Sequence, residues 1–515
     1  SNKTIRVTKK LNADGEGTVR IDTSAGFINA VPATESELET LPLMEQDDGL
    51  QKTSMMLVNA KGAEIIGSGG GLSLVDQNGK VLSNALTSKV IQNGVHVANA
   101  GYDWKLTTSG SEEEASGLYL NYGLTQVELL GQGDSALILY ATPGLPENSL
   151  ANDLSAKVVG SGDLKISAVG ETVSLSNPEN TYTGGTFVMS DSTLKLGADS
   201  ALGATKEVNL AERAILNLND HSQEIGKLTV ATDAQVDMAD SSQLTVKEGG
   251  TVSAGGLKGS GNLIVQGGTL EISGANADFH ASTSIKPDAA VEINSVLGLG
   301  DNEVQDNGTL TLKNIEKPSD GGNPLHYETY LTYDEFANTL IGSGKLNAEN
   351  SSFALTGKNS DFNGTIEVGA DSDIAVFKNS ALGEAKIENN GKLDLLFDEE
   401  YSYIDNFLSG NGTTVVHGYA TVSNNSVQNN SYTGDWLVLG KLSSDKGAHT
   451  SQELWGSGKT ELNWGNIEIF VSDDGFTYDN SLTGHGALWI YSDPNAKGIN
   501  QEFKFDNNLK NNQDF

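Results

Sequence analysis

"NTYTGGTFVMSDSTLKLGADSALG", residues Asn180 to Gly203, has a degraded copy in "NSDFNGTIEVGADSDIAVFKNSALG", residues Asn359 to Gly383. Each stretch begins with Asn, passes through a Gly-Thr step and an alternating run, and ends with Ser-Ala-Leu-Gly. An internal echo of this kind is typical of a repeat architecture, in which one structural unit recurs along an axis. The two similar stretches therefore predict that shorter repeats occur along the rest of the chain.

A Gly-Ser-Gly step followed by alternating apolar and polar residues recurs along the chain. Glycine adopts the positive φ angles of tight turns without penalty, and an alternation of period two places one face of a strand inward. Each step therefore predicts a turn that leads into a short strand. The steps begin at Gly160, Gly259, Gly342 and Gly456, and looser forms begin at Ser409 and Thr483.

A shorter period of roughly 20 residues lies underneath these steps. It is seen in apolar pairs two residues apart: Val208 and Leu210, Leu228 and Val230, Leu216 and Leu218, Val236 and Met238. One rung of this size cannot bury its apolar pair alone, but rungs stacked at about 4.8 Å pair their backbone groups with the rungs on either side. The period therefore predicts an all-β parallel β-solenoid of roughly 20 to 25 rungs. An antiparallel sandwich or barrel is disfavoured because Asn-Gly and Asp-Gly hairpin turns are not regularly placed.

The expected domain organisation is a single elongated domain. Residues 151–465 are expected to form the body of the β-helix, residues 1–150 an N-terminal cap with the first rungs, and residues 466–515 the last rungs with a C-terminal cap. Residues 314–340 interrupt the rhythm with two prolines and several tyrosines. Thr332 and Glu335 fit a capping box, so this loop is predicted to project from the coil and to carry a short helix from about Tyr333 to Leu340.

The charge balance excludes several kinds of partner. Of 515 residues, 32 are Lys or Arg and 68 are Asp or Glu, which gives a net charge of −36, and cysteine is absent. A field of that sign repels nucleic acid and anionic lipid. No stretch approaches ~18 consecutive apolar residues, so membrane insertion by this segment is not expected.

Catalysis is not expected. "GQGDSALI" contains a Gly-Asp-Ser step, but a nucleophilic Ser135 would need a histidine held by an acid, and none of the seven histidines has the expected context. A turn before a strand is the favoured interpretation. A β-helix enzyme acting on polysaccharides stays a minor alternative, since only three arginines are available to face a sugar acid. No cofactor and no metal site are predicted.

Recurring charged residues are the candidates for ligand binding. Asp199, Asp220 and Asp240 recur at the rung spacing and are expected to form a column at one corner. Capping of turns is the favoured role for this column, with hydrogen bonding to glycans and metal binding as alternatives.

Cations of the middle third are the second set of candidates. Lys227 follows Glu207 by one rung, which predicts opposite charges on successive strands of a solvated face. The alternative is a groove for a sulfated glycan, to which these residues would contribute: Arg213, Lys227, Lys247, Lys286 and Lys317. In the predicted loop, His326, Tyr327 and Tyr330 either stack on sugars or hold the loop against the coil.

Several stretches together resemble a known family. "YTGGTFV", "STLKLG", "SALG", "YTGDWLVLGKL", the Gly-Ser-Gly-x-Leu steps and "GLYLNYGLTQVELL" (Gly117 to Leu130) resemble the passenger domains of AIDA-type autotransporters of Gram-negative bacteria. The resemblance runs from about Ser116 to Ile490. It implies a right-handed parallel β-helix, displayed on the cell surface after export through the outer membrane. The translocator that would export it is not expected within this chain.

The resemblance implies an adhesin. Multivalent polar faces would bind host extracellular matrix, either glycosaminoglycan chains or a glycoprotein such as fibronectin. The alternative is homotypic self-association between cells, which leads to aggregation and biofilm. No binding partner of nucleic acid type is expected on either interpretation.

Overall fold

The chain divides into two compact units, Ser1–Thr245 and Val246–Phe515. A computed structural model describes residues 4–22, 40–45, 47, 54–82, 86–108, 116–146, 148–316, 333–399, 402–423, 431–444, 449–471, 476–492 and 503–505. Both units contain a right-handed parallel β-helix, as the sequence predicted. The boundaries expected near residues 150 and 465 stay predictions.

The first part of unit 1 is mainly antiparallel. Strand β9 pairs in antiparallel fashion with β4 and β8, and β8 pairs with β7. The two parallel partners in this sheet are β1, on β4, and β12, on β9. The strands are β1 (Ile5–Arg6), β4 (Met55–Asn59), β7 (Leu86–Gln92), β8 (Val95–Thr107), β9 (Gly117–Leu129) and β12 (Lys157–Gly160).

Smaller elements accompany this sheet. Two parallel pairs are formed by β2 (Lys10–Asn12) with β5 (Glu64–Ile66), and by β3 (Thr18–Arg20) with β6 (Ser73–Val75). Helix α1 (Thr40–Glu45) is short. Leucines of several of these segments share a core with Leu106, Leu118 and Leu120 of the long strands.

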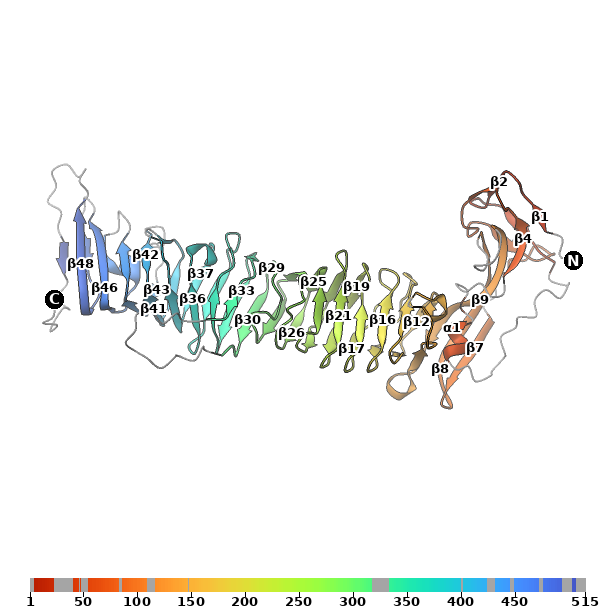
Figure 1. Cartoon of the computed structure of the whole chain (residues 1–515), viewed down its shortest axis with the longest axis horizontal. Helices are drawn as coiled ribbons and strands as arrows, with labels where there is room; N and C mark the ends of the chain where they lie inside the picture. The colour runs from red at the N-terminus through yellow and green to blue at the C-terminus, as the bar shows by residue number, and fades with distance from the viewer. Residues whose placement is uncertain are drawn as a thin grey trace. The chain divides into compact units, whose positions relative to one another are not determined.

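The rest of unit 1 is a parallel coil whose successive strands stack in register (Figure 1). One sheet contains β10 (Leu137–Tyr140), β13 (Leu164–Ser167), β15 (Thr186–Val188), β17 (Glu207–Leu210) and β20 (Lys227–Val230). A second contains β11 (Asp153–Leu154), β14 (Thr172–Leu175), β16 (Thr193–Leu196), β18 (Ile215–Asn217) and β21 (Gln235–Met238). Two further strands are β19 (Ser222–Ile225) and β22 (Gln243–Val246), the latter at the unit boundary.

The predicted register of this coil is confirmed. In the parallel strands β17 and β20, Val208 pairs with Leu228 and Leu210 pairs with Val230. Leu216 likewise pairs with Val236. All six side chains are buried, because the alternating pattern turns every second residue inward.

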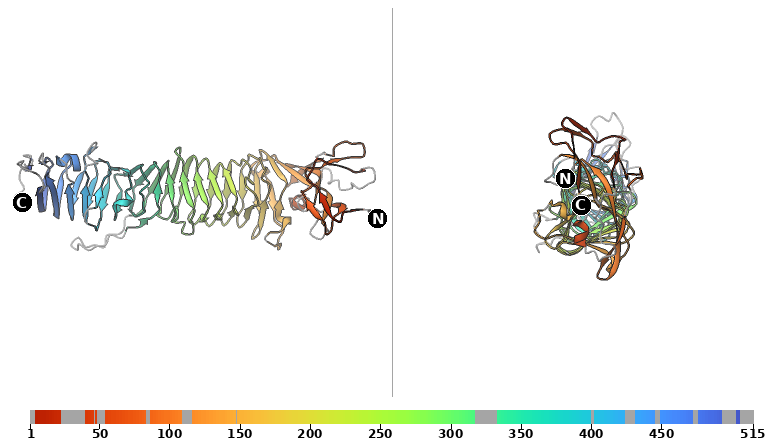
Figure 2. Two further views of the ribbon diagram at one scale, coloured as in Figure 1. Left: turned by 90° about the horizontal axis from the view of Figure 1, so that it is seen from above. Right: turned by 90° about the vertical axis from the view of Figure 1, so that its right-hand side faces the viewer.

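Unit 2 has the same design in three main sheets, whose turns follow one another in order (Figure 1; Figure 2, left). The first contains β23 (Gly250–Val252), β26 (Gly268–Ile272), β28 (Ala289–Ile293), β30 (Thr309–Lys313), β33 (Lys345–Glu349), β35 (Thr365–Val368), β37 (Lys386–Asn389), β40 (Leu408–Gly410) and β43 (Ser431–Tyr432). The second contains β25 (Asn262–Val265), β27 (Ser282–Ile285), β29 (Val304–Asp306) and β32 (Leu340–Ile341). Strand β24 (Leu257–Gly259) precedes β25 in the chain and is not part of this second sheet.

The third sheet of unit 2 carries the features discussed below. Its order is β31 (Glu335–Phe336), β34 (Ser352–Leu355), β36 (Asp373–Val376), β38 (Lys392–Leu395), β41 (Thr413–Val416), β44 (Asp435–Val438), β46 (Thr460–Val471), β45 (Lys441–Ser444), β42 (Tyr419–Val422) and β39 (Tyr403–Ile404). Strand β48 (Leu482–Ser492) also pairs with β46. A separate parallel pair consists of β47 (Phe476–Tyr478) and β49 (Phe503–Phe505).

The predicted number of rungs was too high. The described residues form about 15 turns, whereas a uniform rung predicts roughly 20 to 25. One reason is the antiparallel sheet of unit 1, which uses residues counted as rungs. Another is turn length: Asn314 and Asn350, on neighbouring turns, are 36 residues apart.

The predicted helix from Tyr333 to Leu340 is wrong. Residues Glu335–Phe336 form β31 and Leu340–Ile341 form β32, which pair in parallel with β34 and β29. A helix would forgo these inter-turn hydrogen bonds, and the capping-box signal is local to four residues. A capping box does begin helix α2 (Ser451–Trp455), where Thr450 and Glu453 bond reciprocally. Residues 317–332 of the predicted loop lie outside the described residues.

The Gly-Ser-Gly steps form the predicted turns. The first glycine of every step has a positive φ, for example 97° at Gly160 and 102° at Gly342. At Gly160 an added Cβ would lie 2.3 Å from the carbonyl oxygen of Leu129 on the adjacent turn. Glycine is therefore required there both by conformation and by the close approach of two backbones.

The echo between the two quoted stretches reflects a shared hydrogen-bonding role. The buried Asn180 side chain accepts from Val158 N at 2.7 Å and donates to Ala201 O at 2.6 Å. The buried Asn359 side chain accepts from Leu340 N and donates to Ala381 O, both at 2.7 Å. Each asparagine therefore joins its own turn to the turn before and the turn after, and the alanine it reaches belongs to Ser-Ala-Leu-Gly.

Candidate functional site: a polar pocket on unit 2

Two of the three aspartates of the predicted column in unit 1 cap turns. Asp199 Oδ1 accepts from Ser222 N at 2.8 Å, and Asp220 Oδ1 accepts from Ser241 N at 3.3 Å. The hydrogen bond from Ser222 N lowers the pKa of the Asp199 carboxyl, with a smaller contribution from His221. Asp240 is exposed in the turn after β21. This geometry fits the favoured interpretation, in which the carboxylates satisfy backbone amides of the next turn.

The predicted cations of unit 1 face acidic partners. Arg213 makes a bidentate pair with Asp191, at 2.6 and 2.9 Å, and also contacts Glu212. Lys227 begins β20 directly opposite Glu207 of β17, as predicted for opposite charges on successive strands. Arg213 lies in the turn before β18 and Lys227 starts β20, so the two cations do not share one site.

The remaining predicted residues belong to unit 2. Lys247 is exposed just after β22, and Lys286 is half-buried just after β27. The other predicted residues lie outside the described residues: Lys317, His326, Tyr327 and Tyr330. The structure therefore does not gather the described candidates around a common pocket.

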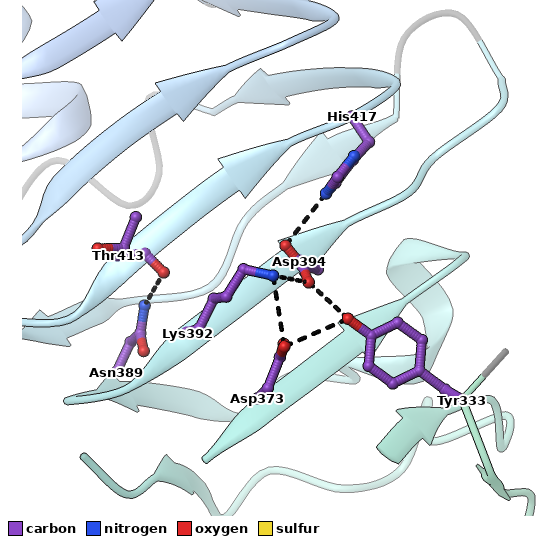
Figure 3. A network of polar contacts seen from close by, with 7 residues as sticks. All are labelled: Tyr333, Asp373, Asn389, Lys392, Asp394, Thr413 and His417. Carbon is purple, nitrogen blue, oxygen red and sulfur yellow. Dashed lines mark hydrogen bonds and ion pairs between the residues drawn. The ribbon is translucent and has the colours of Figure 1, made fainter. Parts of the chain in front are cut away.

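A buried polar network that the sequence did not predict lies on the outer face of the third sheet of unit 2 (Figure 3). Tyr333 packs against Ala354 and Ala375, which are outward-facing residues of β34 and β36. Its hydroxyl donates to Asp394 Oδ2 at 2.7 Å and lies 3.3 Å from Asp373 Oδ2. The tyrosine thus covers a stretch of sheet that would otherwise face solvent.

Asp394 is at the centre of the network. Its side chain is fully buried and also receives Lys392 Nζ at 2.5 Å and His417 Nε2 at 3.1 Å. Burial alone would raise the pKa of Asp394, but the hydrogen bond from His417 and the charge and hydrogen bond of Lys392 hold it well below its usual range. The carboxylate is therefore ionised and saturated with donors, which suits a structural role better than that of a catalytic base.

The partners of Asp394 are affected in turn. Burial acts to lower the pKa of Lys392, but Asp394 and Asp373 together raise it above its ordinary value. Burial and the charge of Asp394 raise the pKa of the Tyr333 phenol. At neutral pH the network therefore holds the Lys392 ammonium, the neutral Tyr333 phenol and the Asp394 carboxylate.

A pocket of about 300 Å³ adjoins this network. Successive turns line it at the corner before β34, β36 and β38, and Asp373 and Lys392 belong to both pocket and network. The lining residues are Asn314, Ile315, Glu316, Asn350, Ser351, Ser352, Asp371, Ser372, Asp373 and Lys392. Every turn around the pocket thus contributes polar groups.

Hydrogen-bond acceptors outnumber cations in this pocket. Glu316, Asp371 and Asp373 supply three carboxylates against the single ammonium of Lys392. Ser352 is 4% exposed, and its hydroxyl has no hydrogen-bond partner among the described residues. A buried polar group without a partner is costly, and such groups in a pocket mark a place where a ligand can supply the missing bond.

Asparagines shape the entrance of the pocket. Asn314 and Asn350 both have positive φ, 57° and 47°, which asparagine tolerates better than most residues. Asn350 Nδ2 donates to Asn314 Oδ1 at 2.9 Å across neighbouring turns. The pair fixes the corner at which Glu316 and Ser351 enter the lining.

Three further observations concern metal ligands, Ser135 and membrane-spanning helices. Within the described ranges no three His, Cys, Asp or Glu side chains are placed to hold a metal ion. Ser135 lies in a short 3₁₀ turn, Gly133–Ser135, that leads into β10, as predicted. The part of the chain that the structure describes has no helix long and apolar enough to cross a membrane.

The sequence carried one weak signal for this site. Ala354 and Ala375 occupy outward strand positions, where most other turns have polar residues, and a small outward residue indicates that something packs on it. Asp373 and Asp394 also lie on strands in which both faces are buried. Such strands are uncommon where only the inner face of the coil is covered.

Fold and pocket together describe the chain as a parallel β-helix with a polar pocket on unit 2. The chain is similar to the Escherichia coli K12 protein named "Uncharacterized lipoprotein YdeK", 35% identical over 435 residues, which cover 84% of this chain and 30% of YdeK. It is also similar to "Uncharacterized protein YuaQ" of the same organism, 40% identical over 308 residues, which cover 60% of this chain and 21% of YuaQ. The chain thus spans less than a third of the length of these relatives. No family model and no solved structure matches it.

Proposed function

We propose that this chain is the binding segment of a cell-envelope adhesin, and that its polar pocket holds an uncharged sugar ring. The observation that carries the proposal is the buried Ser352 hydroxyl, without a partner among the described residues, in a pocket lined by carboxylates and amides. Sugar hydroxyls donate hydrogen bonds, which such acceptors can receive. A pocket of this size lies at the lower end of the range for small ligands, roughly 300 to 1,000 Å³.

The charge of the pocket favours an uncharged glycan over a sulfated one. Three carboxylates and one ammonium leave an excess of negative charge, which repels sulfate groups. Several cations of the middle third are also engaged with acids, as for Lys206 with Asp163 and Lys313 with Glu292 and Glu349. An uncharged glycan of the extracellular matrix is therefore preferred here over a glycosaminoglycan.

The cell-surface location is part of the proposal. The relative YdeK is named a lipoprotein, which supports a place in the cell envelope. The resemblance to AIDA-type passenger domains supports export and display. Labelling of intact cells with an antibody against this chain, before and after surface proteolysis, tests the location; a signal seen only after lysis would overturn it.

Binding is tested with the purified chain and a panel of uncharged monosaccharides and oligosaccharides, with a heparin fragment as the anionic comparison. Titration calorimetry should show binding to a member of the uncharged panel and none to heparin. Ser352→Ala should weaken binding roughly tenfold without loss of stability, because it removes a hydroxyl that lacks a partner. Asp371→Asn should also weaken it, whereas Asp361→Asn, at an exposed position outside the pocket, should not.

Three results would contradict the proposal. Heparin binding that Asp371→Asn strengthens would restore the sulfated-glycan hypothesis. Concentration-dependent self-association without any sugar binding would favour the self-association hypothesis. Sugar binding that Ser352→Ala leaves unchanged would move the site elsewhere.

A further inference from the structure

An exposed group of aromatic side chains lies on the last described turns of unit 2. The Trp464 side chain of β46 is 72% exposed, and Trp489 and Tyr491 of β48 are 49% and 37% exposed. His485 of β48 stacks on Trp464, with ring centroids 6.0 Å apart and an interplanar angle of 25°. Together these four residues are called the aromatic strip below.

The backbone at Trp464 shows that its exposure is imposed by the fold. Its φ is 60°, in the left-handed region that bulky residues rarely adopt. The β46–β48 register shifts between Asn463 and Asn466, so Trp464 and Gly465 form a bulge. Bulges re-aim side chains and are enriched near functional sites. The strained backbone of Trp464 and its exposed indole both lower the stability of the folded state. A residue that does so is expected to have a role in binding.

Three residues of the strip belong to β48. His485, Trp489 and Tyr491 are separated by even numbers of residues, so they lie on one face of the strand. His485 and Trp489 are four residues apart, about 13 Å along an extended strand. Tyr491 contacts Trp489 and stacks on Phe470 of β46 at 5.1 Å and 18°. The rings therefore cover a length that suits several linked rings rather than one.

Charges beside the strip are neutralised. Glu468, opposite Trp489, pairs with Lys441 at 3.0 Å and accepts from Ser443 Oγ at 3.2 Å and Tyr491 OH at 3.4 Å. Lys441 also lies over the Tyr419 ring. The charges of Glu468 and Lys441 thus compensate each other next to the aromatic rings.

We infer that the aromatic strip is a stacking surface for the sugar rings of an uncharged oligosaccharide. Three kinds of partner commonly stack on exposed aromatic rings: nucleic-acid bases, a second protein copy and pyranose rings. The net charge of −36 repels nucleic acid, and it equally repels a second copy of the same chain. An uncharged oligosaccharide meets no such repulsion. The inference extends the proposed adhesive function to a second surface of unit 2.

The test uses tryptophan fluorescence of the whole chain titrated with uncharged hexasaccharides of glucose and of N-acetylglucosamine. Binding should weaken at least roughly tenfold in Trp464→Gly and in Trp489→Ala. Trp464→Gly is the decisive variant because glycine relieves the positive φ, so the melting temperature should hold or rise while binding is lost. Tyr403→Ala, at an exposed aromatic on another strand, is the matched control and should bind normally.

The remaining outcomes separate the two proposals. No binding of any hexasaccharide to the unaltered chain, or equal binding by Trp464→Gly, overturns the inference. Sedimentation that shows self-association abolished by Trp464→Gly overturns it in favour of a second copy. Ser352→Ala should leave the strip's binding unchanged, so failure at the pocket and failure at the strip are distinguishable.

Discussion

The buried carboxyl group of Asp306 is expected to make the stability of the folded chain depend on pH. Asp306 is fully buried at the end of β29, accepts from Gly308 N, and has a second carboxyl oxygen without a partner among the described residues. Burial raises the pKa of Asp306 to about 7, against a smaller opposing effect of that hydrogen bond. Asn389 occupies the corresponding corner of a later turn. The backbone carbonyl oxygen of Asn389 accepts from Gly412 N, as the backbone carbonyl oxygen of Asp306 accepts from Gly344 N.

Asp306→Asn should therefore stabilise the protein at neutral and higher pH. In the folded state Asp306 retains its proton up to about pH 7, whereas in the unfolded state it loses it near 3.8. The folded state binds more protons in that window, so this residue's contribution to stability falls as pH rises from about 4 to 7. Denaturant unfolding at pH 8 should show a gain of about 1 to 3 kcal/mol in the asparagine variant.

The matched control is Asp278→Asn, at an exposed position of the same unit. It should change stability by less than about 0.5 kcal/mol at every pH. An asparagine variant at 306 that is less stable than the parent at pH 8 would show that the carboxylate has a partner the structure does not reveal.

Adjacent turns are held by side chains as well as by strand pairing. Asn180 and Asn359 each connect three turns through backbone groups that have no other way to be satisfied within a narrow corner. Tyr333 bonds to Asp373 of β36 and to Asp394 of β38, and Asp394 also contacts His417, which directly follows β41. These side-chain contacts therefore stabilise several adjacent turns together, and not one strand alone.

Asn359→Ala should cost about 2 to 4 kcal/mol in denaturant unfolding. The substitution leaves Leu340 N and Ala381 O buried without partners. Asn363→Ala, at an exposed position nearby, should be close to neutral. Equal effects of the two alanine substitutions would mean that water replaces the buried amide.

Asp394→Asn should destabilise unit 2 by about 2 kcal/mol at pH 7. The change leaves Lys392 and His417 facing an uncharged amide. Because the folded pKa of Asp394 is depressed, its contribution is present above the unfolded value near 3.8 and is lost as pH falls below it. The parent should therefore lose more stability between pH 5 and pH 2 than the variant; parallel pH profiles would contradict this.

Much of the repetitive part of these elements could be predicted from sequence, because it depends on short periods. The pairing of Val208 with Leu228 and of Leu216 with Val236 follows from alternation and spacing alone. The polar network around Asp394 does not, since Tyr333 reaches Asp373 and Asp394 across 40 and 61 residues. The capping-box signal at Thr332 was outweighed by parallel pairing, an interaction that no local pattern records.

For the whole molecule, net charge is the property whose effect on stability we consider. A net charge of −36 spread over 515 residues makes self-repulsion a term in stability. Paired ladders such as Glu207 with Lys227 relieve it locally. Salt relieves it generally, since the screening length falls to about 8 Å at physiological ionic strength.

Added salt should therefore raise the melting temperature. Between about 10 mM and 150 mM sodium chloride we expect an increase of a few degrees, at about 2 to 4 °C for each kcal/mol of relieved repulsion. Potassium chloride should act equally, which controls for specific ion binding. A melting temperature that falls with salt would show that attractive ion pairs outweigh the net charge.

The corner asparagines and glycines have a consequence for how such chains change in evolution. Since the backbone contacts of a turn involve only its two neighbours, a complete turn is an exchangeable module whose loss or duplication restores the same contacts on both sides. Unequal recombination between echoes such as Asn180–Gly203 and Asn359–Gly383 would therefore yield foldable chains of different lengths. Length variation among homologues should come in whole modules, with point insertions restricted to the corners.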